Sequence, residues 1–347
     1  MQPGFSFVGT KRMVITLNRK NEENGIRPLK PSRDLQGVAN LIEEAFAIEL
    51  DQPGRVALRE MRLMGRWGFL LGWFDYLSPE ANPHLNGFVW VENGRIVGNV
   101  TLSRHTTGSR HWFISNVAVA RSHRRRGIAR ALMTTAINFV KEMRGQSISL
   151  QVRRGNEPAI GLYESLGFKY ISAMSYLYLP RVKETPRILL PEGISLREHH
   201  LNLPDAAAAY TLARSSVPMS VQLERPLRQS QFKLGAEVYF NNFWRDLIGL
   251  AKIKHLVVEQ EPGKFIATLG ILSASWRGEH KLSLLVHPDW WGKLEKPLIS
   301  AALAYLKLFP ARPIAFQHAD EHQPGIQAFE FFGFTVQRTH VWLKLTL

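Results

Sequence analysis

The residues with the clearest chemical capacity lie in the stretch 116–130, which reads NVAVARSHRRRGIAR. The apolar run Val117, Ala118 and Val119 predicts a strand that ends at an arginine-rich loop. A helical spacing of apolar residues starts directly after Gly127 and predicts a helix to about residue 143. Backbone N–H groups at a helix start, together with the helix dipole, favour a bound anion. The stretch therefore predicts a phosphate-binding turn.

Glycine and arginine in this loop support the same chemistry. Gly127 lets the backbone approach a ligand because it has no Cβ, and guanidinium groups bind phosphate oxygens in pairs. The motifs Gly-x-x-x-x-Gly-Lys-Ser/Thr and Gly-x-Gly-x-x-Gly are absent from the stretch. Arginine-rich turns are also typical of solvated or nucleic-acid-facing surfaces, so the turn alone leaves its ligand open.

A second group of chemically capable residues follows one predicted strand later. Residues 147–152 alternate apolar and polar as a strand does, and Asn156 and Pro158 mark the start of a short helix. Tyr163 lies on that helix, which Gly167 ends. Asn156 fits a helix cap, a ligand contact or both. Tyr163 fits either a proton donor or a buried aromatic core residue.

Together the two blocks resemble the GNAT superfamily of N-acetyltransferases. Arg124-x-x-Gly127-x-Ala129 is similar to the family's Arg/Gln-x-x-Gly-x-Gly/Ala signature, and residues 156–168 are similar to its second signature block. The resemblance covers roughly residues 25–179. It implies an acyltransferase that moves an acetyl group from acetyl-coenzyme A, its cosubstrate, to a primary amine by direct attack, without a metal.

The resemblance also implies roles for single residues. The backbone of Val117, Ala118 and Val119 would bind the pantetheine arm and polarise the thioester carbonyl. The residues that would hold the pyrophosphate, mostly through backbone N–H groups, are Arg124, Arg125, Arg126, Gly127, Ile128, Ala129 and Arg130. Asn156 would hydrogen-bond the coenzyme arm. Tyr163 would border the cofactor and act as general acid toward the leaving thiolate.

The general base stays open, because the predicted strand 111–119 contains no carboxylate. His105 and His111 are candidates from the sequence, Glu43, Glu44 and Glu60 are weaker ones, and none of the five is assigned as the base. The acceptor is equally open and would be the amine of a small molecule, a peptide or a protein.

Charge and composition limit the kinds of partner that the chain can bind. The chain of 347 residues carries a formal net charge of +15, and residues 104–154 contain ten arginines and one lysine but a single glutamate. Such a basic region attracts polyanions, coenzyme A or nucleic acid alike. A non-catalytic module that senses coenzyme A or binds nucleic acid is therefore the alternative function. There is no cysteine, which excludes disulfides, thiolate metal sites and a covalent cysteine intermediate.

The apolar segments are too short for a signal peptide in residues 1–20 or for a membrane span in residues 67–77. We therefore expect a cytoplasmic protein with no membrane span.

The second half of the chain resembles a repeat of the first. The landmarks Gly25, Val119 and Gly167 recur at a nearly constant offset as Gly193, Val286 and Gly333. We predict an N-terminal copy (residues 1–180), a proline-containing linker (181–192) and a C-terminal copy (193–347). The expected fold class is α/β (α+β), with two tandem GNAT-like domains, each a mixed, mostly antiparallel central sheet flanked by helices.

The chemistry is not repeated in the C-terminal copy. Residues 290–295, WWGKLE, align with the arginine turn, and Glu295 would repel phosphate. Phe329 aligns with Tyr163, and His322 aligns with Asn156. We therefore expect a degenerate copy that supports the first one, completes the acceptor cleft or forms an oligomer contact.

Overall fold

The computed structural model describes residues 24–46, 58–59, 62, 86–104, 109–200, 202–224, 227–232, 251–274 and 278–347. The chain divides into two compact units, Met1–Leu150 with Leu345–Leu347, and Gln151–Lys344. A few predicted features lie outside the described residues, namely His105, Glu60 and the apolar patch 67–77.

The sheet of the first unit runs in the order β1-β2-β3-β4-β5. Its strands are β1 (Gly25–Pro28), β2 (Asn86–Glu92), β3 (Arg95–Arg104), β4 (His111–Val119) and β5 (Ser147–Arg153). Neighbours are antiparallel except β4 and β5, which are parallel. Asn93 and Gly94 adopt φ values of 51° and 73°, as a two-residue hairpin of this hand requires. The Asn93-Gly94 pair therefore forms the tight turn that joins β2 to β3.

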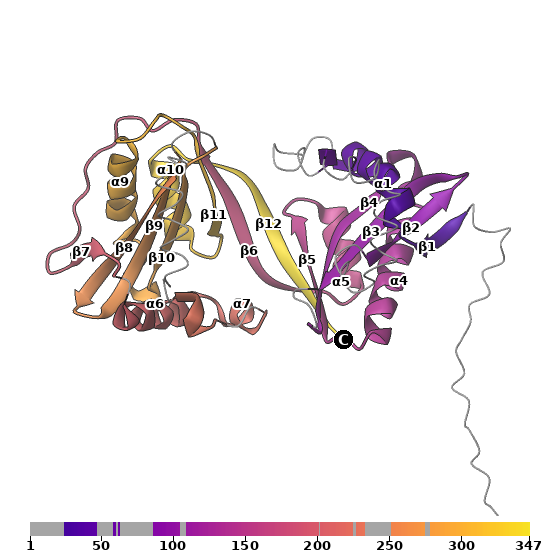
Figure 1. Cartoon of the computed structure of the whole chain (residues 1–347), viewed down its shortest axis with the longest axis horizontal. Helices are drawn as coiled ribbons and strands as arrows, with labels where there is room; N and C mark the ends of the chain where they lie inside the picture. The colour runs from indigo at the N-terminus through magenta and orange to yellow at the C-terminus, as the bar shows by residue number, and fades with distance from the viewer. Residues whose placement is uncertain are drawn as a thin grey trace, which may run out of the picture. The chain divides into compact units, whose positions relative to one another are not determined.

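Two helices cover opposite faces of this sheet (Figure 1). In α1 (Pro31–Phe46) the apolar stripe that includes Val38 and Ile42 packs on Val89 and Val91 of β2. In α4 (Ile128–Glu142) the apolar face packs on β2, β3 and β4. A Cβ at Gly98 of β3 would lie 2.8 Å from Ile128, so glycine permits this close contact.

The second unit repeats this plan with a four-stranded antiparallel sheet in the order β10-β9-β8-β7. The strands of this sheet are β7 (Ser195–Glu198), β8 (Ala251–Glu261), β9 (Lys264–Ala274) and β10 (Lys281–Val286). The unit also contains β6 (Lys169–Leu179), β11 (Ile314–Ala319) and β12 (Thr335–Thr346), with β6 between the other two. Its α-helices are α5 (Glu157–Ser165), α6 (Leu203–Ser216), α7 (Met219–Glu224), α9 (Glu295–Leu306) and α10 (Gln323–Phe331).

The order of elements confirms the tandem fold. A strand and a helix, three antiparallel strands, a short 3₁₀ helix and a helix–strand–helix–strand tail occur in both halves of the chain. The 3₁₀ helices are η2 (Arg121–His123) and η4 (Pro288–Trp290), with a further one, η3 (Gln229–Phe232), in the second half. The predicted mixed, mostly antiparallel sheets flanked by helices are therefore present in each half.

Strand β6 pairs with two strands of the other copy. It follows α5 in the N-terminal copy, yet it pairs antiparallel with both β11 and β12 of the C-terminal copy. Leu177 and Leu179 of β6 belong to the core that contains Leu298 and Leu303 of α9. The unit boundary at residue 150 accordingly precedes the predicted linker. The predicted ranges 1–180, 181–192 and 193–347 remain a prediction about the repeat.

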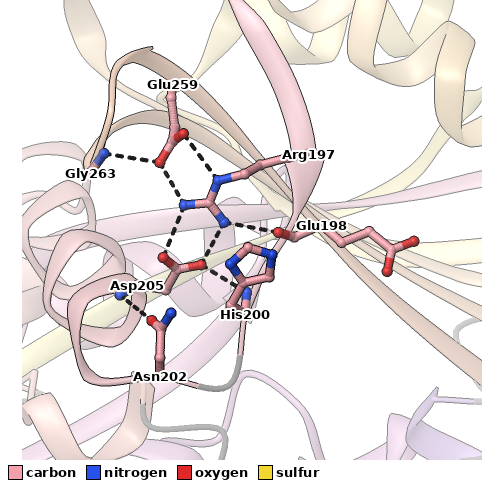
Figure 2. Close-up of polar contacts among 7 residues, drawn as sticks. All are labelled: Arg197, Glu198, His200, Asn202, Asp205, Glu259 and Gly263. Carbon is pink, nitrogen blue, oxygen red and sulfur yellow. Dashed lines mark hydrogen bonds and ion pairs between the residues drawn. The ribbon is translucent and has the colours of Figure 1, made fainter.

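Each copy opens on the same ion pair between its first strand and first helix. Arg27 donates to both oxygens of Asp34 at 2.6 and 2.7 Å, and Arg197 donates to both oxygens of Asp205 at 2.7 and 2.9 Å. Figure 2 shows that Arg197 also reaches Glu259 of β8, at 2.6 and 3.0 Å. Arg197 thus joins β7, α6 and β8.

Replacing Arg197 with methionine is expected to lower the free energy of unfolding at pH 7 by about 2 kcal/mol, because two nearly buried carboxylates lose their shared cation. Hydrogen bonds from Arg197 hold the pKa values of Asp205 and Glu259 below their ordinary values. This stabilisation is present above the unfolded pKa values and is lost as the pH falls through the folded ones. Denaturant titrations should therefore show the difference between the proteins shrinking from about pH 5 to pH 3.

The exposed Arg214 on α6 supplies a matched control, since Arg214→Met removes a cation of the same helix. This control should leave the pH dependence unchanged. A constant difference between wild type and Arg197→Met from pH 7 to pH 3 would contradict the proposed role of the ion pair.

Candidate active site

The pairing of strand β4 with β5 ends before β4 reaches the arginine turn. Its parallel pairing with β5 runs from His111 opposite Ser147 to Ile114 opposite Leu150 and ends there. Val117, Ala118 and Val119 follow beyond this paired segment, on the β5-facing edge. The end of this pairing would leave backbone groups of β4 available to a ligand.

The turn after β4 has two residues with left-handed backbone. Ala120 N donates to Val97 O at 2.9 Å, and η2 follows directly. Arg125 and Gly127 then take φ values of 64° and 78°. Gly127 is the N-cap of α4, and it supplies no side chain to bond the N–H groups of the first helical turn. Those donors therefore suit an external anion.

The arginine side chains of this turn differ in their hydrogen-bond partners and exposure. Arg126 makes two hydrogen bonds to Glu92 of β2, at 2.9 and 3.1 Å, and His123 lies 3.2 Å from the same carboxylate. The pKa of Glu92 is held below its ordinary value, mainly by the Arg126 hydrogen bonds. Arg124 donates from Nε to Val119 O at 3.3 Å. Arg125 is exposed, so its guanidinium can meet a ligand at the mouth of the turn.

Helix α1 also contacts the turn. Glu44 accepts a hydrogen bond from the backbone N–H of Arg121 at 3.0 Å, and its other oxygen lies 3.7 Å from Arg95. Glu92 and Glu44 therefore brace the turn from two sides. From the sequence, Glu44 is a candidate only as a base, and no motif points to Glu92, which lies next to the Asn93-Gly94 turn.

Asn156 and Tyr163 belong to the second unit, while residues 117–130 belong to the first. Asn156 caps α5, since its Oδ1 accepts from the backbone N–H of Ala159 at 3.3 Å. Tyr163 is 6% exposed, and its ring centroid lies 6.1 Å from that of Phe168. Burial raises the pKa of the Tyr163 phenol to about 12, so the hydroxyl stays protonated at neutral pH.

The general-base candidates differ in where they lie. His111 begins β4 and bonds Ser147 Oγ at 2.8 Å. At about 3.3 Å per residue it lies roughly 20 Å from Val117 along the strand, too far for proton transfer at the strand's other end. Glu43 pairs with Arg62, and Glu44 is engaged by the turn. We therefore assign none of the described candidates, His111, Glu43 and Glu44, as the general base.

The counterpart of the turn in the C-terminal copy has a related backbone. Trp291 is extended (φ −59°, ψ 138°) like Arg124 (φ −65°, ψ 159°), and Gly292 has φ 81° where Arg125 has 64°. By backbone conformation Gly292 therefore corresponds to Arg125, whereas the sequence alignment places Gly292 opposite Arg126. Glu295 then takes the first helical position, where the N-terminal copy has Ile128.

The carboxylate of Glu295 fills this second turn. It is 1% exposed, and its Oε1 accepts the Gly292 N–H at 2.9 Å and lies 2.8 Å from His322 Nε2. Burial alone would raise the pKa of Glu295, but hydrogen bonds from His322 and Gly292 outweigh it and lower the pKa. Trp291 stacks on His322 with centroids 4.6 Å apart. An internal anion thus occupies the position where the N-terminal turn offers donors to a ligand.

Comparison with known proteins agrees with this geometry. Residues 47–168 match the sequence model of the Acetyltransferase (GNAT) family. The matched residues lie in the N-terminal half of the chain. The C-terminal half has the same order of elements without the arginines of the turn and without a tyrosine at the position of Tyr163.

Curated proteins that resemble part of this chain include N-acetyltransferases. The catalytic subunit of the N-terminal acetyltransferase A complex of Arabidopsis thaliana is 41% identical over 80 residues, which are 22% of this chain and 42% of that protein. An N-alpha-acetyltransferase of Sulfurisphaera tokodaii is 31% identical over 101 residues, 26% of this chain and 60% of that protein. The chain thus spans about half the length of these relatives.

Solved structures extend the likeness to both halves. A GCN5-related N-acetyltransferase from Sphaerobacter thermophilus has a TM-score of 0.60 and 16% identity, over 94% of this chain and 96% of that chain. A tandem GNAT protein from the clavulanic acid biosynthesis pathway has a TM-score of 0.50 and 19% identity, over 92% of this chain and 98% of that chain. At these identities the likeness shows a shared fold over both halves of the chain.

Within the described ranges, no group of three histidine or acidic residues is arranged to hold a metal ion. No helix among the described residues is long and apolar enough to cross a bilayer.

Proposed function

We propose that the chain is an N-acetyltransferase that uses acetyl-coenzyme A in its N-terminal copy and a primary amine as acceptor. The observation that carries this proposal is the turn of residues 120–127, which presents uncapped helix N–H groups and arginines directly after an unpaired strand edge. The family match of residues 47–168 and the named N-acetyltransferase relatives support it.

The chain's residues would divide the chemistry as follows. The N–H groups after Gly127, with Arg124 and Arg125, hold the diphosphate, and backbone N–H groups of β4 polarise the thioester carbonyl. The neutral amine attacks the carbonyl carbon, the new C–N bond forms and the C–S bond breaks. The Tyr163 phenol supplies the proton that the departing thiolate takes up, and the acceptor nitrogen releases its extra proton to water or to a base.

We further propose that the C-terminal copy binds no acetyl-coenzyme A. Glu295 already satisfies the Gly292 N–H and brings negative charge to the place of the phosphate. The position of Tyr163 is held by the fully buried Phe329, which has no hydroxyl. The copy instead supplies β11 and β12, between which β6 lies.

The absence of cysteine makes the test simple, because a thiol-reactive dye reads only coenzyme A released by the reaction. We expect amine-dependent thiol release in a panel of small amines, amino acids, aminoglycosides and peptides with free N-termini. Binding of acetyl-coenzyme A without release for any member of this panel would favour the non-catalytic sensing module instead.

A further inference from the structure

Strand β4 departs from regular geometry just before the turn. Asn99 of β3 pairs with Ala118, and Thr101 pairs with Ser115, so the single residue between Asn99 and Thr101 faces both Asn116 and Val117. Asn116 has φ 52°, a left-handed backbone conformation that residues other than glycine rarely adopt. These features define a β-bulge, which turns the backbone that follows it.

A cluster of buried polar side chains holds this bulge. Asn99 is 0% exposed, and its Nδ2 donates to the backbone oxygen of Asn116 at 2.8 Å and to Thr101 Oγ1 at 3.2 Å. Asn116 Nδ2 lies 3.5 Å from the same hydroxyl. Asn99 therefore bonds the backbone of Asn116, the residue of the bulge whose φ is 52°.

Stability alone does not account for this cluster. The Asn99 Oδ1 is buried without a hydrogen-bond partner among the described protein groups. A buried polar atom left in this way costs about 1–3 kcal/mol, and Asn99 bears this cost while its Nδ2 holds the carbonyl oxygen of Asn116.

The C-terminal copy offers an internal comparison. Its equivalent strand β10 pairs with β9 from Lys281 to Val286 with no register shift. Thr268 lies opposite Leu285 there, whereas Asn99 lies opposite Ala118. The copy whose turn is filled by Glu295 thus lacks the bulge, and the copy with the open turn has it.

We propose that Asn99 and Thr101 are positioning residues that set the bulge so that the backbone of Val117 and Ala118 meets the thioester carbonyl. This inference rests on the proposed acetyltransferase function. It assigns the two side chains to alignment of the acyl group, while the turn of residues 120–127 binds the diphosphate independently of them.

The decisive variants are Asn99→Leu and Thr101→Val, with Thr101→Ser as the matched control that keeps the hydroxyl. We expect kcat to fall about 100-fold in Asn99→Leu, since a misplacement of about 1 Å has an effect of this size. Thr101→Val should lower kcat about 10-fold, and Thr101→Ser should retain it. Calorimetric affinity for coenzyme A should stay within about twofold of wild type in all three.

A rescue variant separates alignment from general stability. Asn116→Gly adopts φ 52° without strain, so adding it to Asn99→Leu should recover part of the lost kcat. Unchanged kcat in both Asn99→Leu and Thr101→Val, or equal losses of kcat and coenzyme A affinity, would overturn the inference while leaving the proposed function intact. A wild-type protein inactive on every amine would overturn the proposed function itself.

Discussion

Calorimetric titration of the Gly127→Glu protein with acetyl-coenzyme A is expected to show a loss of affinity of at least about 100-fold, because like charges brought together in a binding site cost several kcal/mol. Gly127 caps α4 with φ 78°, so a carboxylate there sits at the donors that the diphosphate needs. The C-terminal copy already shows a carboxylate in this kind of turn, where Glu295 accepts the Gly292 N–H.

Two controls separate charge from backbone strain. A Cβ at Gly127 meets no atom within 4 Å, so Gly127→Ala tests the positive φ alone and should weaken binding only slightly. Gly278 also has a positive φ and open space around it, and Gly278→Glu adds the same charge elsewhere in the chain. Equal affinities of wild type and Gly127→Glu would place the cofactor at another site.

Tyr163→Phe is expected to lower kcat about 100-fold while the affinity for coenzyme A changes by less than about twofold. The phenol has a pKa raised to about 12 by burial, so it remains protonated and able to donate throughout the neutral range. The ring packs near Phe168, and phenylalanine keeps that contact. A thiol-release assay at saturating acetyl-coenzyme A measures the difference.

A second tyrosine serves as the control for this variant. Tyr170 lies on β6, and its hydroxyl donates a hydrogen bond to Glu321 Oε1 at 2.7 Å. Tyr170→Phe should leave kcat unchanged. Wild-type turnover should also show no loss from ionisation of Tyr163 below about pH 10, because its raised pKa lies above that range. An unchanged kcat in Tyr163→Phe would remove this residue from the acid role.

Local elements of the N-terminal copy could be predicted because each is fixed by nearby residues. The Asn93-Gly94 pair defines its hairpin, and the apolar spacing after Gly127 defines α4 from Ile128. The cap of α5 follows from Asn156 in the same way. In each case the determining residues lie within one turn or one strand of the element.

Partner choice of β6 could not be predicted from its sequence. The alternation of apolar and polar residues in residues 169–179 specifies which face is buried, but it is satisfied by any antiparallel neighbour. Only the folded chain shows that β11 and β12 lie on its two edges.

The contacts that complete the two turns depend on residues far apart in the chain. Glu92 reaches Arg126 because the sheet brings the end of β2 beside the turn, and no motif marks that carboxylate. The repulsion of phosphate by Glu295 stays a prediction, and the sequence does not show that His322 and the Gly292 N–H bind this carboxylate. The roles of the turn residues, Asn156 and Tyr163 stay predictions.

A crystal structure of the full chain with bound coenzyme A would test the account most directly. We predict one molecule per chain, with its diphosphate within hydrogen-bond distance of the backbone N–H groups that follow Arg124, while Glu295 keeps its bond to Gly292. A diphosphate bound at residues 288–295, or anywhere away from Gly127, would contradict the account.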